Sequence, residues 1–503
     1  MDTEIDGKLG ANGGAPGASL APMAVKGSFW IFALRITNRG LGLLRTIILA
    51  RLLLPEHFGI LGIVAVTISA LETFTQPGLG TALVHKREEI EPYLDTAWTV
   101  SVFRCVLIFG LLYVIAPSMA FFFETLQAEV VLRVLAISVI IAGCRNIGVI
   151  YFQKELDFRK QYIYELSITL GNIVVAIPAA FLLRSVWALV VGGIAGSMVR
   201  FVMSYVLHPY RPRMRFEKEE FKDLFSFGKW VLGSSMLLFL VTQGDDIFMG
   251  KMFGVTALGF YQMAFMISNL PTTEISQVIS HVTFPAYSKI QDDQQRFGAA
   301  YLKVLQVVLF IVIPLSGIIF TLSPELVCLV LSEKWLPVVP IIEVLVWAGL
   351  IKAIMDTTVP VFNAAGKPNI HTKWQMGNLL VLGISIYPLA MSLGVIGVSI
   401  AVLLGNMVAS VGLIHEAHRV LRYDCLRFSK LTAFPMIGMF FSMGLVLCLK
   451  QIMWHNNIVA LGVPVVCFVL TYVTVIYVFD KVFRYNMGSI LRETIVSLRT
   501  TER

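Results

Sequence analysis

Three arginines and one asparagine interrupt the first long apolar stretch of the chain. Arg35, Asn38, Arg39 and Arg45 lie within about three turns of a helix, which would place them in one polar stripe about 120° wide. A charged side chain inside a membrane usually faces the interior of a helix bundle or a water-filled cavity. Because guanidinium groups form forked hydrogen bonds with phosphate, the stripe predicts a hydrated cavity that binds a phosphate-bearing anion.

The same arginines could instead extend to the membrane surfaces or pair with carboxylates elsewhere in the fold. The depth of Arg39 and Arg45 and the stripe that they share favour a cavity lining. Arg145, in a later apolar stretch, is a further candidate for the anion. Lys352 and Asp356 are four residues apart, a spacing that predicts an ion pair within one helix.

Two adjacent acids, Asp245 and Asp246, lie in the apolar segment VTQGDDIFMG. Their side chains would point about 100° apart on a helix, so we expect one of them to face the cavity together with Gln243. A buried carboxylate can carry a proton, or it can bind sodium with neighbouring oxygens. It can equally serve as the partner of an arginine in the first half. Glu274 is a further candidate for a coupling-ion site.

The composition is that of a membrane protein. Of the 503 residues, 57% are hydrophobic and 14% are charged, and the mean hydropathy is +0.77. Soluble domains are about 45–50% apolar and about 25% charged. Apolar runs long enough to cross a bilayer recur about fourteen times, which predicts an all-α polytopic fold. The predicted spans are 27–50, 58–82, 97–119, 130–152, 162–183, 186–207, 230–250, 257–284, 302–322, 338–360, 374–393, 395–417, 431–449 and 458–479.

The charges between these spans predict the orientation. Lys- and Arg-rich segments such as QKELDFRK and RPRMRFEKEEFK all fall on one side, which is typical of the cytoplasmic side of a membrane. Both termini are therefore expected inside, and the short outside connections leave little room for a catalytic domain. The predicted units are a disordered tail (1–26), a bundle (27–207), a linker (208–229), a second bundle (230–417), two extra helices (418–480) and a cytoplasmic tail (481–503).

The two bundles show a weak internal repeat. A shift of 200 residues aligns ARLLLPEHFGIL with GKMFGVTALGFY, which pairs Arg51 with Lys251 and Gly59 with Gly259. The identity is slight, but both segments join two predicted spans through a short outside turn. Duplicated halves are common among transporters. The pattern therefore predicts two pseudo-symmetric bundles.

Motifs for the common enzyme chemistries do not occur in the sequence. Walker A, G-x-S-x-G and H-E-x-x-H patterns are missing, so neither ATP hydrolysis by a P-loop nor these hydrolase mechanisms are indicated. The six cysteines have no CxxC spacing, which argues against a metal centre or a disulfide framework. The amino-terminal segment lacks the apolar core of a signal peptide. We therefore expect no enzyme activity, no metal, no nucleic-acid partner and no cofactor, with coupling to H⁺ or Na⁺ left open.

Four segments carry a family resemblance: ILARLLLPEHFGILG, QPGLGTALVHKRE, FQKELDFRK and NAAGKPN. In order and spacing they resemble the polysaccharide transporter (Wzx-type) branch of the MOP flippase superfamily, most of all its colanic-acid and succinoglycan exporters. The resemblance implies a flippase of the bacterial inner membrane that moves undecaprenyl-pyrophosphate-linked oligosaccharides for O-antigen, capsule or exopolysaccharide synthesis. It also implies alternating access between two lobes, with the stripe arginines as head-group ligands and Asp245 or Asp246 as an ion site.

Three other functions remain possible from the sequence. A MATE-type drug antiporter has a related architecture, but its cationic cargo would favour acids over arginines in the first bundle. A polymerase or ligase of the same pathway would be expected to have a long external loop, and a scaffold would leave the buried charges unexplained. As partners we expect the lipid-linked substrate, membrane lipids and the polymerase and chain-length machinery, with the chain itself a monomer.

Overall fold

The computed structural model describes residues 20–76, 78–85, 90–155, 157–452, 458–483 and 488. The side chain of Arg35 and most of the predicted tails 1–26 and 481–503 lie outside the described residues. Within the described part the chain is helical and contains no strand. Eleven of its helices are long and apolar enough to cross a membrane. The predicted all-α polytopic fold is confirmed, while the count of fourteen spans stays a prediction.

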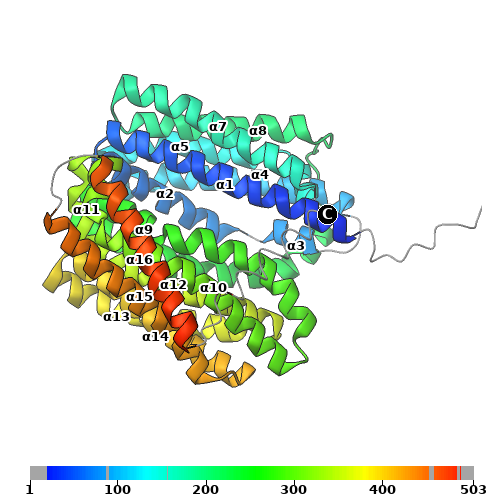
Figure 1. Ribbon diagram of the computed structural model, residues 1–503. Coiled ribbons are helices and arrows are strands. Elements are labelled where there is room, and N and C mark those ends of the chain that lie inside the picture. The colour runs from blue at the N-terminus through cyan, green and yellow to red at the C-terminus, as the bar shows by residue number, and fades with distance from the viewer. Residues whose placement is uncertain are drawn as a thin grey trace, which may run out of the picture.

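The helices fall into two groups that lie side by side, with those coloured blue to cyan above those coloured green to red in Figure 1. The first half contains α1 (Leu20–Leu52), α2 (Pro55–Thr75), α3 (Leu79–His85), α4 (Glu91–Phe122), α5 (Leu126–Gly143), η1 (Ile147–Ile150), α6 (Tyr151–Lys154), α7 (Phe158–Leu183) and α8 (Trp187–Leu207). The second half contains α9 (Lys218–Ile290), α10 (Gln294–Thr321), α11 (Ser323–Leu326), η2 (Val327–Leu331), η3 (Glu333–Val338), α12 (Val339–Ala364), α13 (Asn369–Leu393), α14 (Val395–Leu421), α15 (Cys425–Ile452) and α16 (Ile458–Phe483).

Some predicted boundaries differ from the observed ones. The predicted span 130–152 is interrupted, because α5 ends at Gly143 and the Asn146 side chain caps η1 by accepting a hydrogen bond from the Gly148 N–H. The predicted linker 208–229 is partly helical, since α9 begins at Lys218. Side-chain capping is a local hydrogen bond that hydropathy does not register. Arg145 consequently lies in a bend beyond the end of α5.

The seventh and eighth predicted spans are the two arms of α9. The helix folds back on itself at Gly254, whose φ of 79° and ψ of 179° are open to glycine and strained for other residues. Contacts between residues sixteen apart, Asp245 with Tyr261 and Asp246 with Gln262, confirm that the arms run side by side. The short turn predicted between these spans is therefore present.

The weak repeat corresponds to a reciprocal contact between α2 and α9. A Cβ atom on Gly59 would overlap the Val255 carbonyl oxygen, and a Cβ on Gly259 would overlap the Pro55 carbonyl oxygen. Either added Cβ would also lie 3.1 Å from the backbone nitrogen of the other glycine. All of these pairs are related by the shift of 200 residues, and reciprocal contacts of this kind are what a two-fold axis produces. The two halves therefore meet at equivalent glycines.

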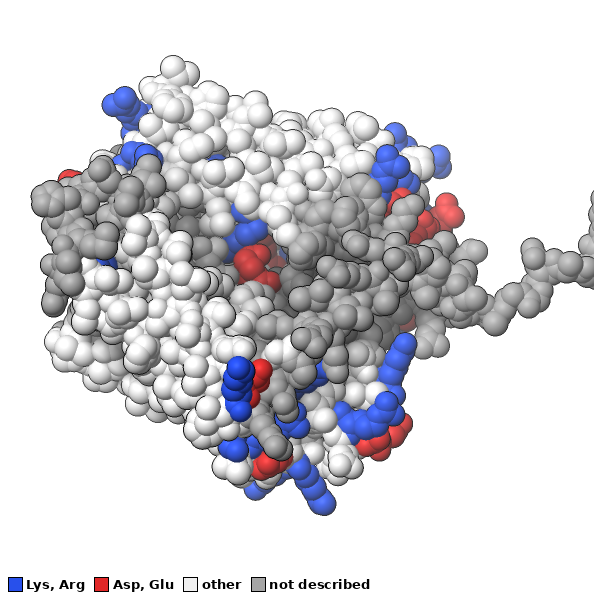
Figure 2. Space-filling view, viewed as in Figure 1, with Lys and Arg blue, Asp and Glu red and all other residues white. Residues whose placement is uncertain are grey.

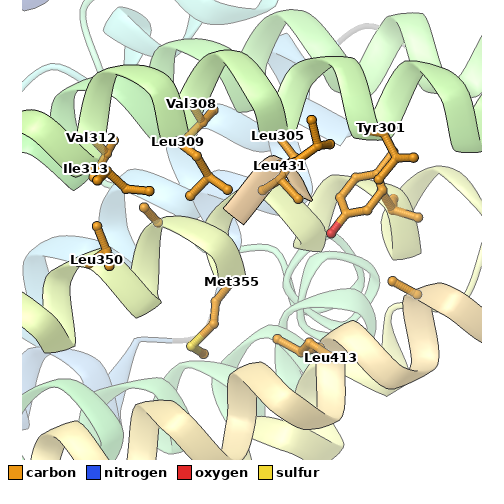
Figure 3. Close-up of a cluster of buried hydrophobic side chains, with 14 of the residues drawn as sticks. Tyr301, Leu305, Val308, Leu309, Val312, Ile313, Leu350, Met355, Leu413 and Leu431 are labelled. Carbon is orange, nitrogen blue, oxygen red and sulfur yellow. The ribbon is translucent and has the colours of Figure 1, made fainter. Parts of the chain in front are cut away.

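Apolar packing holds the second half together behind this contact. Figure 3 shows α10 directing Tyr301, Leu305 and Leu309 toward Leu350 of α12 and Leu413 of α14, and these side chains are at most 7% exposed. A second apolar cluster joins the halves, because it contains Ala50 and Ile63 from the first half together with residues of α9 and α12. The rest of the first half has apolar clusters of its own. The two halves thus share one core at their junction.

Candidate functional site

Hydrogen bonds join the halves at the end where α1 passes into α2, which the charge pattern predicts to lie outside. Here the Arg51 side chain donates hydrogen bonds to the carbonyl oxygens of Leu329 and Val330 in η2. Trp335 of η3 is fully buried, and its Nε1 donates to the Ala50 carbonyl oxygen at 2.8 Å. These contacts link the first half to the connection between α10 and α12. They close the predicted outer end of the interface between the halves.

The same closure is repeated from the other half. Lys251, which the sequence repeat pairs with Arg51, forms a 3.0 Å ion pair with Glu124 in the connection between α4 and α5. Arg51 and Lys251 thus each reach the other half at the connection between its third and fourth spans. The seal is therefore pseudo-symmetric, like the glycine contact beneath it.

Deeper between the halves, an ion pair connects α1 to α9. Nε of Arg39 lies 2.7 Å from Oε1 of Glu274, and the two side chains are 37% and 43% exposed. In Figure 2, basic and acidic atoms meet in a recess between the two halves, and the described surface to its left and above it is largely free of charge. An arginine paired with the opposite half and still partly exposed remains accessible to another anion.

Arg45, another member of the stripe, contacts the first half. Nη1 of Arg45 donates to Oδ1 of Asn172 in α7 at 2.8 Å, and Asn172 in turn donates to the Gly192 carbonyl oxygen of α8 at 2.9 Å. Oδ1 of Asn38 is buried and has no hydrogen-bond partner among the described residues. The stripe therefore extends from the second half at Arg39 to the first-half core at Arg45. Whether these residues bind a ligand stays a prediction.

The two adjacent acids lie within the α9 hairpin. Asp245 is 5% exposed and accepts a hydrogen bond from the Tyr261 hydroxyl at 2.5 Å, while Asp246 accepts one from Nε2 of Gln262 at 3.2 Å. Oδ1 of Asp245 is buried without a partner in the described part of the chain. Gln243, two residues before Asp245, is half-buried. The contacts described for these acids are with the second arm of α9 and not with an arginine of the first half.

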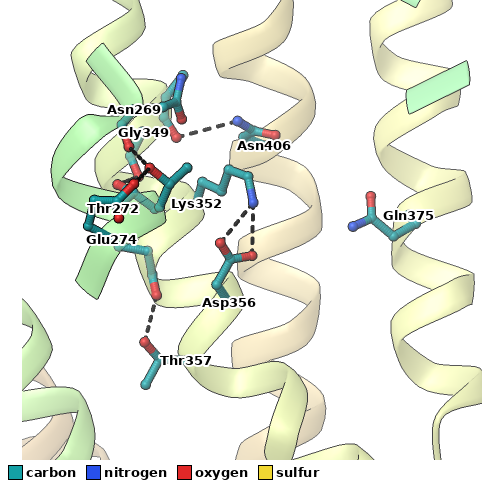
Figure 4. A network of polar contacts seen from close by, with 12 residues as sticks. Asn269, Thr272, Glu274, Gly349, Lys352, Asp356, Thr357, Gln375 and Asn406 are labelled. Atoms are coloured by element: carbon teal, nitrogen blue, oxygen red, sulfur yellow. Dashed lines mark hydrogen bonds and ion pairs between the residues drawn. The ribbon is translucent and has the colours of Figure 1, made fainter. Parts of the chain in front are cut away.

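A polar network continues from Glu274 into the second half (Figure 4). Thr272 donates to the Gly349 carbonyl oxygen at 2.7 Å, and Lys352 and Asp356 form an ion pair at 2.8 Å within α12. The predicted pairing of Lys352 with Asp356 is confirmed. The network brings polar side chains of α9 and α12 together in a mostly apolar half.

Arg145 lies apart from the stripe, in a cavity of the first half. This cavity has a volume of about 470 Å³ and is lined by residues of α3 to α7, among them Trp98, Arg104, Gln161 and Tyr164. No pattern in the sequence indicates these lining residues as a group. Dispersed aromatic and amide side chains leave no linear motif, so only the packing of six helical segments, α3 to α7 with η1, brings them together.

The sequence matches the model of a family described as "Polysaccharide biosynthesis protein" over residues 48–340. The match covers more than half of the chain and includes the outer seal, and it begins three residues after Arg45, the last member of the stripe. The chain belongs to this family. The residues that carried the resemblance in the sequence fall largely inside the matched region.

Two curated relatives are similar over most of the chain. The teichuronic acid biosynthesis protein TuaB of Bacillus subtilis is 27% identical over 62% of this chain and 65% of its own length. The lipopolysaccharide biosynthesis protein WzxC of Escherichia coli is 23% identical over 78% of this chain and 80% of its own length. Both printed names concern biosynthesis, of teichuronic acid in one case and of lipopolysaccharide in the other.

Solved structures share the fold. The lipid II flippase MurJ in an inward closed conformation superposes with a TM-score of 0.76 at 15% identity, covering 90% of this chain and 99% of MurJ. An inward-facing multidrug MATE transporter of the MOP superfamily superposes with a TM-score of 0.61 at 18% identity, covering 77% and 98%. At these identities the likeness concerns the fold alone.

Proposed function

We propose that this protein is a flippase that moves undecaprenyl-pyrophosphate-linked oligosaccharide repeat units across the bacterial inner membrane for exopolysaccharide, O-antigen or capsule synthesis. The observation that carries the proposal is the Arg39–Glu274 ion pair, which bridges the two halves and remains partly exposed beneath a sealed outer end. The family and the names of its relatives support polysaccharide synthesis as the context. The protein acts as a transporter and not as an enzyme.

The geometry supports a simple exchange of anions at the head-group site. A pyrophosphate that enters the recess competes with the Glu274 carboxylate for the Arg39 guanidinium, which offers several N–H donors in a fork that fits phosphate oxygens. Asn38, one residue away, adds amide groups at the same depth. Loss of the Arg39–Glu274 pair removes a link between the halves, so cargo binding favours their movement. This exchange couples the occupied site to alternating access.

The proposal places both termini in the cytoplasm and the Arg51–Trp335 seal at the outer face. We assign ion coupling to the α9 hairpin, where the unpartnered Oδ1 of Asp245 is available to a proton or to Na⁺. The chain acts as a monomer among membrane lipids and delivers its cargo to the polymerase and chain-length machinery. The basic stripe disfavours cationic drugs as cargo, which separates this function from that of MATE antiporters.

Complementation tests the function. The host is a bacterial strain that lacks its own repeat-unit flippase and carries the native glycan locus of this protein. It expresses, at matched levels, the wild-type protein or one of the variants Arg39→Ala, Glu274→Gln and the control Arg133→Ala. Arg133 is also a partly buried arginine of a membrane-spanning helix, but its partner Glu129 lies four residues away in the same helix. We expect surface polysaccharide with wild type and with the control, and its loss with Arg39→Ala.

The outcomes separate the parts of the proposal. Failure of wild type with its own glycan locus would overturn the flippase function. Export with Arg39→Ala at the wild-type level would retain the flippase and refute the head-group site. Treatment of the wild-type strain with a proton or a sodium ionophore shows which gradient drives export, and insensitivity to both would refute ion coupling.

A further inference from the structure

The two halves differ at one position of the interface that they share. The shift of 200 residues that relates Gly59 to Gly259 also relates Gly62 to Gln262. A Cβ atom on Gly62 would overlap the side-chain amide of Gln262. The second half therefore places a polar side chain in the space that a glycine of the first half leaves open. The close approach at Gly59 and Gly259 does not require this side chain.

The same side chain contacts the adjacent acids of the α9 hairpin. Nε2 of Gln262 donates a hydrogen bond to Oδ2 of Asp246 at 3.2 Å. Asp245, the neighbouring acid, accepts its hydrogen bond from the Tyr261 hydroxyl, and its Oδ1 has no partner among the described residues. One amide thus touches α2 of the first half on one side and an ionisable group of the second half on the other.

The acids have no counter-charge in the described part of the chain. Their side-chain hydrogen bonds are with Tyr261 and Gln262, and Tyr261 is the titratable side chain that faces them. The helices α2 and α12 pack against α9. Their charged and titratable side chains make no described contact with either acid: Glu56, His57, Glu72, Glu343, Lys352 and Asp356. Two neighbouring carboxylates inside a membrane are costly to keep ionised, so a bound cation stabilises them.

The repeat also relates a base of the first half to one of these acids. Asp245 is the equivalent of Arg45 under the shift of 200 residues. Equivalent positions of the two halves therefore carry opposite charges. This arrangement fits a division of tasks in which the first half binds an anion and the α9 hairpin binds a cation.

The charge of Asp246 determines how firmly the amide is held. A hydrogen bond to an ionised carboxylate is about twice as strong as one to a neutral acceptor. Ionised Asp246 holds the Gln262 amide in place against Gly62, with α2 and α9 in contact. Once H⁺ or Na⁺ neutralises the carboxylate, the amide is held less firmly and the packing beside Gly62 is weakened.

We propose that Gln262 is a positioning residue that transmits neutralisation of the acid pair to the contact between the halves. Uptake of the cation thereby favours separation of their outer ends. The inference rests on the proposed function, in which the α9 hairpin carries ion coupling. It adds the side chain through which that site acts on the interface.

The distance between two spin labels across the outer end tests the proposal. The labels are attached at Leu126→Cys in the first half and Leu393→Cys in the second, both exposed positions. The carrier is the full-length protein in nanodiscs, with its six native cysteines replaced by serine. Measurements at pH 7.5 and 5.5, and at pH 7.5 with sodium in place of potassium, distinguish the two cations. For the wild-type interface we expect the cation that binds to increase the population of long distances about twofold.

Three variants in this labelled background locate the response. Gln262→Met keeps a side chain of similar length without the amide, and we expect it to lose the response. Asp246→Asn removes the charge, so at pH 7.5 in potassium it should show the long-distance population that the wild-type interface reaches with the cation. Gln291→Met, at an exposed glutamine that follows the last residue of α9, is the matched control and should respond like the wild-type interface.

Each other outcome has a defined meaning. A full response of Gln262→Met would overturn the role of Gln262 and assign the response to another group, such as His57 at the outer end. Asp246→Asn leaves the interface side chains unchanged, so it decides the question if Gln262→Met does not fold, and a population that stays at the cation-free level would overturn the proposal. No response of the wild-type interface to either cation would refute both ion coupling at the hairpin and this inference. The flippase function would then still be judged by complementation.

Discussion

Individual charges inside this bundle are accommodated by specific partners. Arg39 meets a carboxylate of the opposite half, Arg45 meets an amide of its own half, and Lys352 meets Asp356 one turn along α12. The three pairs differ in what they connect, and only the first joins the two halves. A charge bound within one helix contributes to local stability, whereas a charge bound across the halves also responds to their movement.

The Lys352–Asp356 pair leads to a stability prediction. Asp356→Asn leaves the ammonium group of the partly buried Lys352 without its counter-charge. We expect the free energy of unfolding to fall by about 1–3 kcal/mol. This loss is smaller than for a fully buried pair, because both side chains are about one third exposed. Thermal unfolding in detergent measures the change. The double variant Lys352→Met/Asp356→Leu removes both charges and should recover most of the lost stability. If the double variant is as unstable as Asp356→Asn, the two side chains do more than neutralise each other.

His208 predicts a pH dependence at the connection to α9. Burial is the main cause that lowers the pKa of this imidazole, and the positive charges of Lys160 and Arg211 lower it further. The negative charge of Glu155 raises the pKa and partly offsets the decrease. Its Nδ1 accepts a hydrogen bond from the Tyr210 N–H at 3.2 Å, which requires the neutral ring. The unfolded chain therefore binds a proton that the folded chain excludes, and stability is lost as the pH falls below about 6.5.

Thermal unfolding of wild type and His208→Asn at pH 7.5 and 5.5 checks this expectation. The amide oxygen of asparagine can accept the same hydrogen bond but does not titrate. We expect a smaller decrease in melting temperature on acidification for the variant. An equal decrease in both proteins would show that other groups carry the pH dependence.

At the scale of helices, the contact of α2 with α9 depends on the absence of side chains. Backbone atoms of Pro55 and Val255 occupy the space that a Cβ at Gly259 or Gly59 would need. Small residues allow helices to approach closely inside membranes, where packing and not water exclusion holds helices together. Because the two glycines are equivalent, damage at either should have the same effect.

Gly59→Ala and Gly259→Ala are each expected to destabilise the protein by about 1–3 kcal/mol, as overpacking does, and to force the outer ends of the two helices apart. Thermal unfolding and the complementation assay measure the two effects. Gly110→Ala in α4 is the control, because a Cβ there would meet no atom within 4 Å. A large loss for only one of the two interface glycines would argue against the pseudo-symmetric contact.

For the whole molecule, the described contacts hold one end of the interface between the halves closed. The Arg51, Lys251 and Trp335 contacts all lie at this end, and Trp335 also packs edge-on against Phe58 and Phe260, one from each half. Alternating access requires these bonds to break together, because separation of the halves exposes all of them. The seal is therefore expected to act as one cooperative unit.

Arg51→Ala/Trp335→Phe removes two hydrogen-bonding side chains from this unit. We expect faster hydrogen–deuterium exchange in residues 50–62 and 327–338 because the seal opens more often, with little change in α15 and α16. Trp347→Phe is the control, since its indole N–H makes no hydrogen bond within the described residues. Exchange that accelerates everywhere would indicate general unfolding and would contradict a local seal.

The sequence by itself determined the class of protein, the approximate positions of the spans, the arginine stripe and the Lys352–Asp356 pair. These features are local: a membrane span, a helical face and an i,i+4 pair follow from the composition and spacing of nearby residues. Even the repeat that pairs Gly59 with Gly259 could be read by comparing the halves. It did not show that these glycines touch.

Only the tertiary structure decided which residues meet across helices. Glu274 as the partner of Arg39, Asn172 as the partner of Arg45 and Tyr261 beside Asp245 depend on the depth and rotation at which helices pack. The first-half cavity likewise forms only where segments distant in the chain converge. Hydropathy and helical periodicity fix which face of a helix is polar, but the neighbour of that face is set by the packing of the whole bundle.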